Sequence, residues 1–246
     1  MRSYKLAKYN IKSILKGIII YYALFICVIT GIELIGGFSI ENGSSSGLEF
    51  SSAIFLFVLG LNSFRETFYF TQANNIPRMD YFKATAISIF PIALAMSIFD
   101  VIINRVHNLI SVSPTMYDMA YYNSFSFKGP WTQSNSIQTL FGTITFLFAL
   151  YIVAFGIGLL ITMIYYKCNK IMKIIVSLSP VAVSAIYGQM VYYNHDFGQG
   201  VAIFIDNILG ISTKNSYMAV ITFICLFIIL MMFVYLLVRK AVIKKV

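Results

Sequence analysis

Six apolar stretches set the limits on how this chain can fold, because each is long enough to cross the hydrocarbon core of a membrane. An α-helix needs about 20 residues for that crossing. The stretches cover residues 18–38, 48–68, 84–104, 137–165, 171–192 and 216–238. Because backbone polar groups inside lipid must be hydrogen-bonded within the segment, they predict an all-α integral membrane protein with six transmembrane helices.

The composition excludes a soluble domain. Hydrophobic residues make up 59% of the 246 positions and charged residues 11%, about half the charged fraction of a soluble protein. The net charge of +9 is carried by clusters of Lys and Arg beside the apolar stretches. A nucleic-acid-binding surface would need a continuous basic stripe, so we expect no nucleic-acid partner.

Two of the stretches are irregular. The apolar run of the second ends at Phe64, where Arg65 and Glu66 follow, and these charges are expected at the inner headgroup level. The fourth stretch is longer than a span requires, which predicts a tilt, or a bend near Gly156 and Gly158.

The distribution of basic residues predicts the topology. Fifteen of the 18 Lys and Arg residues lie in the N-terminal segment, the 65–83 segment, the 167–173 turn and the C-terminal tail. Arg105, Lys128 and Lys214 lie on the opposite side. Because basic loops remain in the cytoplasm, both termini are expected there, in the cell membrane of a bacterium.

Residues 1–17 form a separate unit before the first stretch. Their lysines recur at helical spacing and make a basic face of Lys5, Lys8, Lys12 and Lys16. Leu6 and Ile14 can then face lipid, which predicts an amphipathic helix lying on the inner membrane surface. A positively charged topology anchor is the equally weighted alternative.

Two segments on the outer side carry further signals. The longest loop, 105–136, has Trp131 and several Tyr and Phe residues, as segments at the headgroup level do. The apolar run 201–211 is too short to span the membrane, and we expect an interfacial or re-entrant helix there.

No enzyme motif is convincing, and no catalytic residue or metal ligand is predicted. The sequence lacks a GxxxxGK[ST] phosphate-binding loop, an HExxH motif and any Cys/His cluster. The only match to a nucleophile motif, 43–47, lies in a short outer loop without the required strand and helix. Cofactors are therefore not expected in this chain.

Glu33 and Asp100 are the acids nearest to the interior of the predicted spans, at similar depth in the outer leaflet. Intramembrane acids are costly and usually face protein, a partner or water. They are possible pathway residues that contact cationic groups of a substrate. Solvation at the outer headgroup border is the alternative that we favour.

The cytoplasmic segment 65–83 has the composition of a docking surface. The second helix is expected to continue through an aromatic stretch, Asn74 and Asn75 to end it in the left-handed conformation, and Pro77 to prevent its continuation. A plain topological loop need not be this aromatic. The candidate docking residues are Glu66, Phe68, Tyr69, Phe70, Gln72, Asn74, Asn75 and Arg78.

At this segment the chain resembles the ABC-2 type transporter permeases. Many members of that family have Phe-x-x-x-x-Gln-Asn-Gly-apolar-Ser-Arg-Lys-x-x-Phe here, and this chain has Gln-Ala-Asn-Asn-Ile-Pro-Arg-Met-Asp-Tyr-Phe at 72–82. Asn75 stands where the family often has Gly, and Pro77 and Met79 replace the usual Ser and Lys. The likeness covers about ten residues in motif and the whole chain in topology.

The resemblance implies a permease subunit that works as a pair, with a coupling helix that contacts a separate ATP-binding cassette ATPase. ATP and Mg would be bound by that ATPase. Substrates would be amphipathic peptides or other amphipathic molecules moved outward, as in exporters of phenol-soluble modulins or in lantibiotic-immunity transporters. An ion-coupled secondary transporter and an intramembrane enzyme remain as alternatives, although the enzyme lacks paired catalytic groups in the spans.

Overall fold

The computed structural model describes residues 2–36, 47–121 and 133–239. Within them, the side chains of Glu33, Arg65, Glu66 and His195 are among those not described. Every regular element in these ranges is an α-helix, so the all-helical prediction is confirmed for them. The helices are α1 (Arg2–Gly36), α2 (Glu49–Ala73), α3 (Arg78–His107), α4 (Met116–Tyr121), α5 (Ile137–Lys167), α6 (Lys170–Tyr193), α7 (His195–Leu209) and α8 (Ser216–Arg239).

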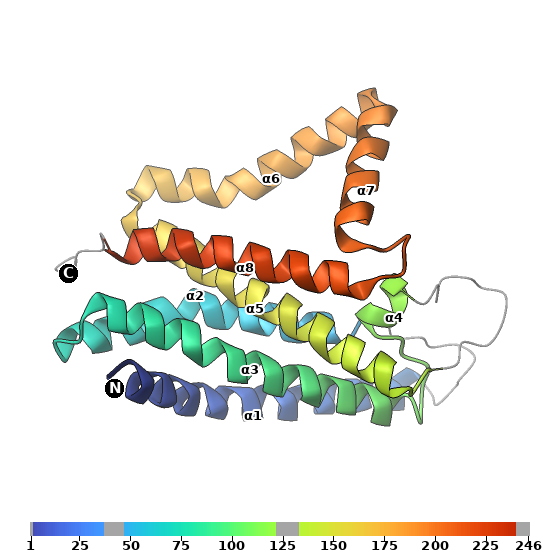
Figure 1. Ribbon diagram of the computed structural model, residues 1–246, viewed down its shortest axis with the longest axis horizontal. Helices are drawn as coiled ribbons and strands as arrows, with labels where there is room; N and C mark the ends of the chain where they lie inside the picture. The colour runs from blue at the N-terminus through green and yellow to red at the C-terminus, as the bar shows by residue number, and fades with distance from the viewer. Residues whose placement is uncertain (1, 37–46, 122–132, 240–246) are drawn as a thin grey trace.

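Five long helices form a bundle with α5 at its centre. Helix α5 packs against α2, α3, α8 and the short α4, whereas α1 packs on the outer side of α3. Figure 1 shows α1, α2, α3, α5 and α8 running alongside one another, with α6 and α7 standing away from them as an arm. The bundle interior is a single large cluster of buried aromatic and aliphatic side chains contributed by these helices.

Five helices are long and apolar enough to cross a membrane, which makes this a membrane-embedded protein by length and composition. They are α1 over residues 3–31, α3, α5, α6 and α8. Helix α2 is not among these five, and the side chains of Arg65 and Glu66 within it are not described. The prediction of six spans is therefore shown for five, and α2 lies alongside them in the bundle.

The N-terminal 17 residues are continuous with the first span. Helix α1 runs from Arg2 to Gly36 without a break, so a separate interfacial helix over 1–17 is not confirmed. The apolar face that we expected in lipid instead faces protein. Leu6 and Ala7 are buried against Ala84 of α3, and Ile14 packs on the main interior cluster.

Helices α2 and α5 approach so closely that only glycine fits at their contact. A Cβ on Gly60 would lie 2.3 Å from the carbonyl oxygen of Phe155, and one on Gly158 would lie 2.2 Å from that of Phe57. Small residues at such crossings allow helix backbones to pack directly in membranes. Helix α5 is unbroken from Ile137 to Lys167 and crosses the bundle obliquely (Figure 1). Gly158 therefore allows the close contact with α2 and does not interrupt the helix.

The arm consists of α6 and α7, which pack against each other. None of the residues of α6 is buried, although its surface is largely Ile, Val, Leu and Met. Helix α7 has 15 residues, too few to span a membrane. It confirms the predicted short helix and runs across the bundle direction in Figure 1 before the chain returns through α8.

One end of the bundle collects the start of α1, the α2–α3 turn, the α5–α6 turn and the end of α8 (Figure 1). Ser3 Oγ donates a hydrogen bond to Asp80 Oδ1 at 2.7 Å, which joins the starts of α1 and α3. Arg78 Nη1 donates to the carbonyl oxygen of Arg239 at 3.2 Å, which joins α3 to α8. These are the segments that carry most of the basic residues.

The opposite end holds a short helix that hydropathy did not reveal. Helix α4 begins with reciprocal capping, in which Thr115 N and Oγ1 donate to Asp118 Oδ2, and Asp118 N donates to Thr115 Oγ1. The pattern Thr-x-x-Asp is the sequence signal for this start. Trp131, expected at the headgroup level, lies outside the described residues.

Candidate functional site

The α2–α3 turn has the geometry that the sequence predicted. Asn75 has a φ of 51°, so the left-handed residue falls directly after the C-cap Asn74. Ile76 N donates to the carbonyl oxygen of Thr71 at 2.9 Å, and Asn75 N donates to that of Gln72 at 3.1 Å. This pair of bonds is the Schellman motif. Pro77 is the N-cap of α3, so the chain reverses within four residues.

The candidate docking residues divide into an exposed group and a buried one. Tyr69, Phe70, Asn74 and Asn75 are exposed at the end of the bundle, and Gln72 and Arg78 are half-buried. Phe68 is 0% exposed. Its ring stacks on Phe64 and meets Tyr81 and Tyr166 edge-on. The prediction that Phe68 belongs to a docking surface is therefore wrong. The side chain of Glu66 lies outside the described residues.

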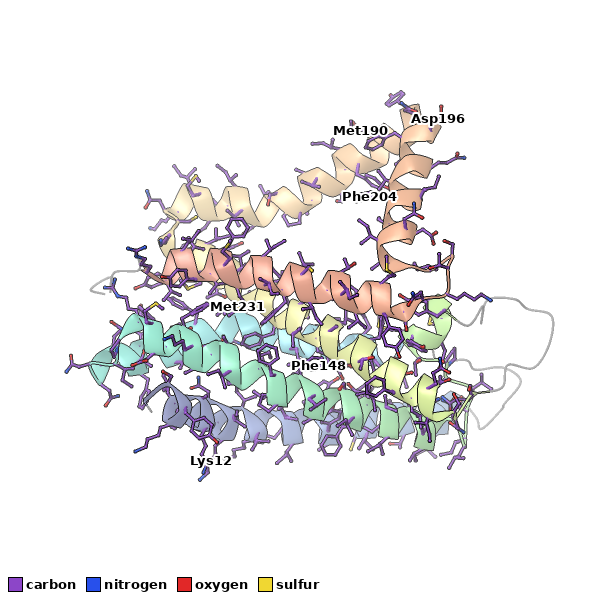
Figure 2. The ribbon with its side chains drawn as sticks, viewed as in Figure 1. Lys12, Phe148, Met190, Asp196, Phe204 and Met231 are labelled. Atoms are coloured by element: carbon purple, nitrogen blue, oxygen red, sulfur yellow. The ribbon has the colours of Figure 1, made fainter. Side chains whose placement is uncertain are left out.

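The basic face predicted for the start of α1 is exposed. All four of its lysines are exposed, whereas Leu6, Ala7 and Asn10 on the opposite side of the helix are buried. Figure 2 shows Lys12 pointing away from the bundle. The apolar side of this segment therefore faces the bundle, and its lysines face the surroundings, where they can contact lipid headgroups or a partner.

Asp100 is the centre of a buried hydrogen-bond cluster. It is 3% exposed, which overturns the favoured interpretation that it is solvated. Tyr22 OH and Ser52 Oγ donate to its Oδ1 at 2.9 and 3.0 Å, and Tyr151 OH donates to its Oδ2 at 2.5 Å. These donors come from α1, α2 and α5, so one carboxyl on α3 ties four helices together. The side chain of Glu33, the other predicted acid, is not described.

Glu49 was not among the candidate residues drawn from the sequence. It opens α2 and is 2% exposed. Neither of its carboxyl oxygens has a well-formed hydrogen bond within the described part of the chain, although the backbone N–H groups of Glu49 and Met116 lie close to the carboxyl group. It lies within electrostatic range of Asp100, Asp118 and Arg105. The signal that could have identified it is its position at the start of a helix. The helix dipole stabilises an acidic side chain there, and the side chain is buried where the helix packs in the bundle.

The described residues contain no group of three His, Cys, Asp or Glu side chains that could hold a metal ion. Comparison with protein-family models, with curated proteins and with solved structures found no match. What the fold and these sites define is therefore a class: an all-helical membrane-embedded protein with an exposed turn at one end and a buried polar cluster toward the other.

Proposed function

We propose that this chain is the membrane-spanning permease subunit of an ATP-driven exporter, energised by a separate ATP-binding cassette ATPase that binds ATP and Mg. The observation that carries the proposal is the rigid, exposed α2–α3 turn. Its Schellman bonds hold Tyr69, Asn74 and Asn75 outward at the end of the bundle where the basic segments gather. A preformed surface loses little conformational entropy when a partner binds.

The topology in this proposal has six crossings, with α2 as the sixth and both ends in the cytoplasm of a bacterial cell. Its support is that the basic segments share one end of the bundle. The exported molecules would be amphipathic peptides or other amphiphiles. ATP binding would bias an equilibrium between two arrangements of the bundle, as any ligand-driven switch requires.

A second copy of the chain would complete the transporter. The support for this is α6, whose Ile, Val and Leu side chains are largely exposed, and which packs mainly on a short neighbour, α7, with a hydrogen bond between Ser177 and Tyr165 of α5. Pro180 lies inside α6, and proline bends a helix by removing a backbone hydrogen bond. A bent apolar arm of this kind can reach around a partner helix, while lipid covers what remains.

Co-purification tests the docking surface. The tagged full-length chain would be purified from its native host in mild detergent, and we expect a stoichiometric ATPase with a phosphate-binding loop. The double variant Tyr69→Ala/Arg78→Ala should lose that ATPase, because Tyr69 is exposed at this end of the bundle and Arg78 is half-buried directly after the turn. Arg78 also bonds to Arg239, so monodispersity on gel filtration must accompany the loss.

The matched control is Tyr192→Ala/Tyr193→Ala, which removes two exposed rings at the far end of α6 and should retain the ATPase. Phe68 is unsuitable for this test, because truncating a buried aromatic costs about 3–5 kcal/mol of stability. Loss of the ATPase could then result from unfolding of the chain. A chain that elutes alone, even after crosslinking, would contradict the permease proposal.

An ion-coupled secondary transporter is the second candidate, and Glu49 is the observation in its favour. A buried carboxyl without well-formed hydrogen bonds is costly when ionised and readily carries a proton. If the chain elutes alone, this candidate requires substrate accumulation in vesicles driven by a pH gradient, with no ATPase present. Transport that ignores the pH gradient would exclude it.

A further inference from the structure

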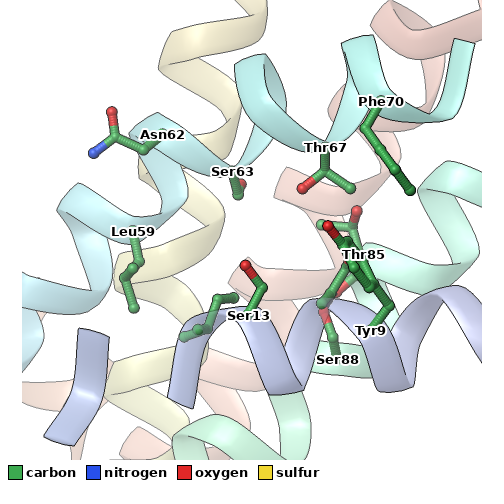
Figure 3. A pocket seen from close by; sticks show the side chains of 11 residues that line it. Tyr9, Ser13, Leu59, Asn62, Ser63, Thr67, Phe70, Thr85 and Ser88 are labelled. Atoms are coloured by element: carbon green, nitrogen blue, oxygen red, sulfur yellow. Dashed lines mark hydrogen bonds between the residues drawn. The ribbon is translucent and has the colours of Figure 1, made fainter. Parts of the chain in front are cut away.

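A polar pocket of about 120 Å³ lies between α1, α2 and α3. Hydroxyl and carboxamide groups gather in it from Asn10, Ser13, Asn62, Ser63, Thr67 and Ser88. No side chain that lines it within the described residues is charged. Figure 3 shows Ser13 of α1 pointing toward α2, with Thr67 and Phe70 pointing back from α2. Such a cluster is unusual among helices that otherwise pack apolar surfaces.

Aromatic contacts close the space between α1 and α2 on either side of the pocket. Tyr9 stacks on Phe70 with ring centroids 5.0 Å apart, and Tyr21 stacks on Phe55 at 4.3 Å. Between these contacts α1 is held by α3, its main neighbour. Leu59 and Ile14 add apolar walls. The pocket is therefore a polar hollow with an apolar border, which suits the junction between a polar head and a hydrocarbon chain.

The hydrogen-bonding capacity of the pocket is only partly used. Asn10 is 6% exposed, and its carboxamide oxygen has no hydrogen-bond partner in the part of the chain that the structure describes. Ser63 and Ser88 donate to carbonyl oxygens of their own helices, Gly60 and Thr85, and their oxygens still have lone pairs to accept further bonds. The hollow thus offers acceptors to a ligand that brings donors, namely hydroxyl or amide N–H groups.

The depth of the pocket indicates where such a ligand is anchored. Its α2 residues lie within two turns of Arg65, and Thr85 lies two residues beyond Lys83. These charges mark the inner headgroup level in the predicted topology. The basic face of α1 points elsewhere, as Lys12 shows in Figure 2. None of the described side chains that line the pocket would pair with a phosphate or carboxylate, which would be desolvated there.

We propose that this pocket binds the uncharged, hydroxyl- or amide-bearing head of a membrane amphiphile whose apolar chain lies in the inner leaflet. The inference requires that the bundle is inserted in a membrane with the end that carries the basic segments at the inner surface. It goes beyond the proposed ATPase docking, and either proposal can fail while the other stands.

Photolabelling in vesicles tests the pocket. The purified full-length chain would be reconstituted in phosphatidylcholine vesicles containing a diacylglycerol with a diazirine on the first carbons of one chain. A phosphatidic acid with the same chains and diazirine is the charged comparison. We expect the diacylglycerol probe to label peptides covering residues 9–14 and 59–70, and the phosphatidic acid probe to label them several-fold less. Equal labelling by both probes would overturn the proposal, since it is what an ordinary lipid shell gives.

Two variants assign the labelling to the pocket. Asn10→Leu removes the unpartnered carboxamide oxygen and should lower labelling by about fivefold, the effect of one net hydrogen bond. Ser13→Ala, at the exposed rim, should lower it in the same direction and decides the outcome if Asn10→Leu does not fold. Ser179→Ala removes a hydroxyl from exposed α6 and is the matched control. Labelling of both pocket variants at the level of this control would overturn the proposal.

Competition identifies the source of the head. Displacement of the probe by excess unlabelled diacylglycerol, but not by lauroylglycerol, assigns the pocket to a resident two-chain lipid. Displacement by lauroylglycerol assigns it to a mobile single-chain amphiphile, the kind of molecule that an exporter would move.

Discussion

At the scale of single residues, the environment of a side chain decides its role more than its chemical type does. Asp100 and Glu49 are both acids toward the end of the bundle opposite the basic segments, and both are buried. Asp100 accepts hydrogen bonds from three helices, whereas the carboxyl group of Glu49 has no well-formed hydrogen bond among the described residues. A buried carboxyl with hydrogen-bond donors stabilises the packing of the helices that supply them. A buried carboxyl without them carries a desolvation cost, which protonation or movement of the group would relieve.

Tyr151→Phe should therefore destabilise the bundle. The change removes the 2.5 Å hydrogen bond from Tyr151 OH to Asp100 Oδ2 and leaves the ring in place. We expect the free energy of unfolding to fall by about 1–2 kcal/mol. Hydrogen bonds to carboxyl groups contribute more than an average hydrogen bond in soluble proteins, but in membrane bundles the contribution is smaller because the freed groups find other partners. The free energy of unfolding would be measured by circular dichroism during titration of dodecyl sulfate into maltoside micelles.

The control for this measurement is Tyr187→Phe, which removes a hydroxyl from an exposed position on α6. It should leave the unfolding free energy unchanged within error. If the two variants behave alike, the Asp100 cluster does not stabilise the bundle.

At the scale of helices, close approach and not hydrophobicity organises the bundle. Apolar side chains gain little by leaving lipid for another helix, so membrane helices associate through packing and hydrogen bonds. The α2–α5 contact at Gly60 and Gly158 follows this rule, with each glycine facing a backbone carbonyl of the other helix. It also places α2 against α5 at the centre of the bundle.

Gly60→Ala should disturb this contact strongly. The added methyl would lie 2.3 Å from the carbonyl oxygen of Phe155, and backbone cannot move aside as a side chain can. Overpacking of this kind costs about 1–3 kcal/mol, and we expect a corresponding fall in the unfolding free energy. Gly17→Ala is the matched control in α1, where an added Cβ meets nothing within 4 Å. It should be neutral or stabilising, since alanine favours a helix by up to about 1 kcal/mol.

At the scale of the whole molecule, the basic segments share one end of the bundle, as their sequence positions predicted they would share one side of the membrane. The free thiol of Cys168 lies in the α5–α6 turn at that end. Lys214 lies in the α7–α8 connection at the other end and is exposed. The two positions therefore report the two sides.

Thiol labelling of intact cells should separate these positions. With Cys27 and Cys225 replaced by Ser, Cys168 should react with a membrane-impermeant maleimide only after permeabilisation. A Lys214→Cys variant that also lacks Cys168 should react in intact cells. A third variant, Tyr4→Cys, should behave as Cys168 does if α2 crosses the membrane as proposed, because the number of crossings between the two positions is then even. Reaction of Tyr4→Cys from outside, with Cys168 still protected, would mean that α2 does not cross.

The class of protein, most of the long helices and the turn between α2 and α3 could be predicted from the sequence, whereas α4 and the continuity of α1 through residues 1–17 could not. Hydropathy, charge and residues such as Asn75 and Pro77 act over a few neighbours, so their effects can be predicted without knowing what packs where. Only the tertiary structure decided that Phe68 is interior, that α1 turns Leu6 toward α3, and that Asp100 meets hydroxyls from three helices. These facts depend on which helix faces meet, and that is set by contacts between residues far apart in the chain.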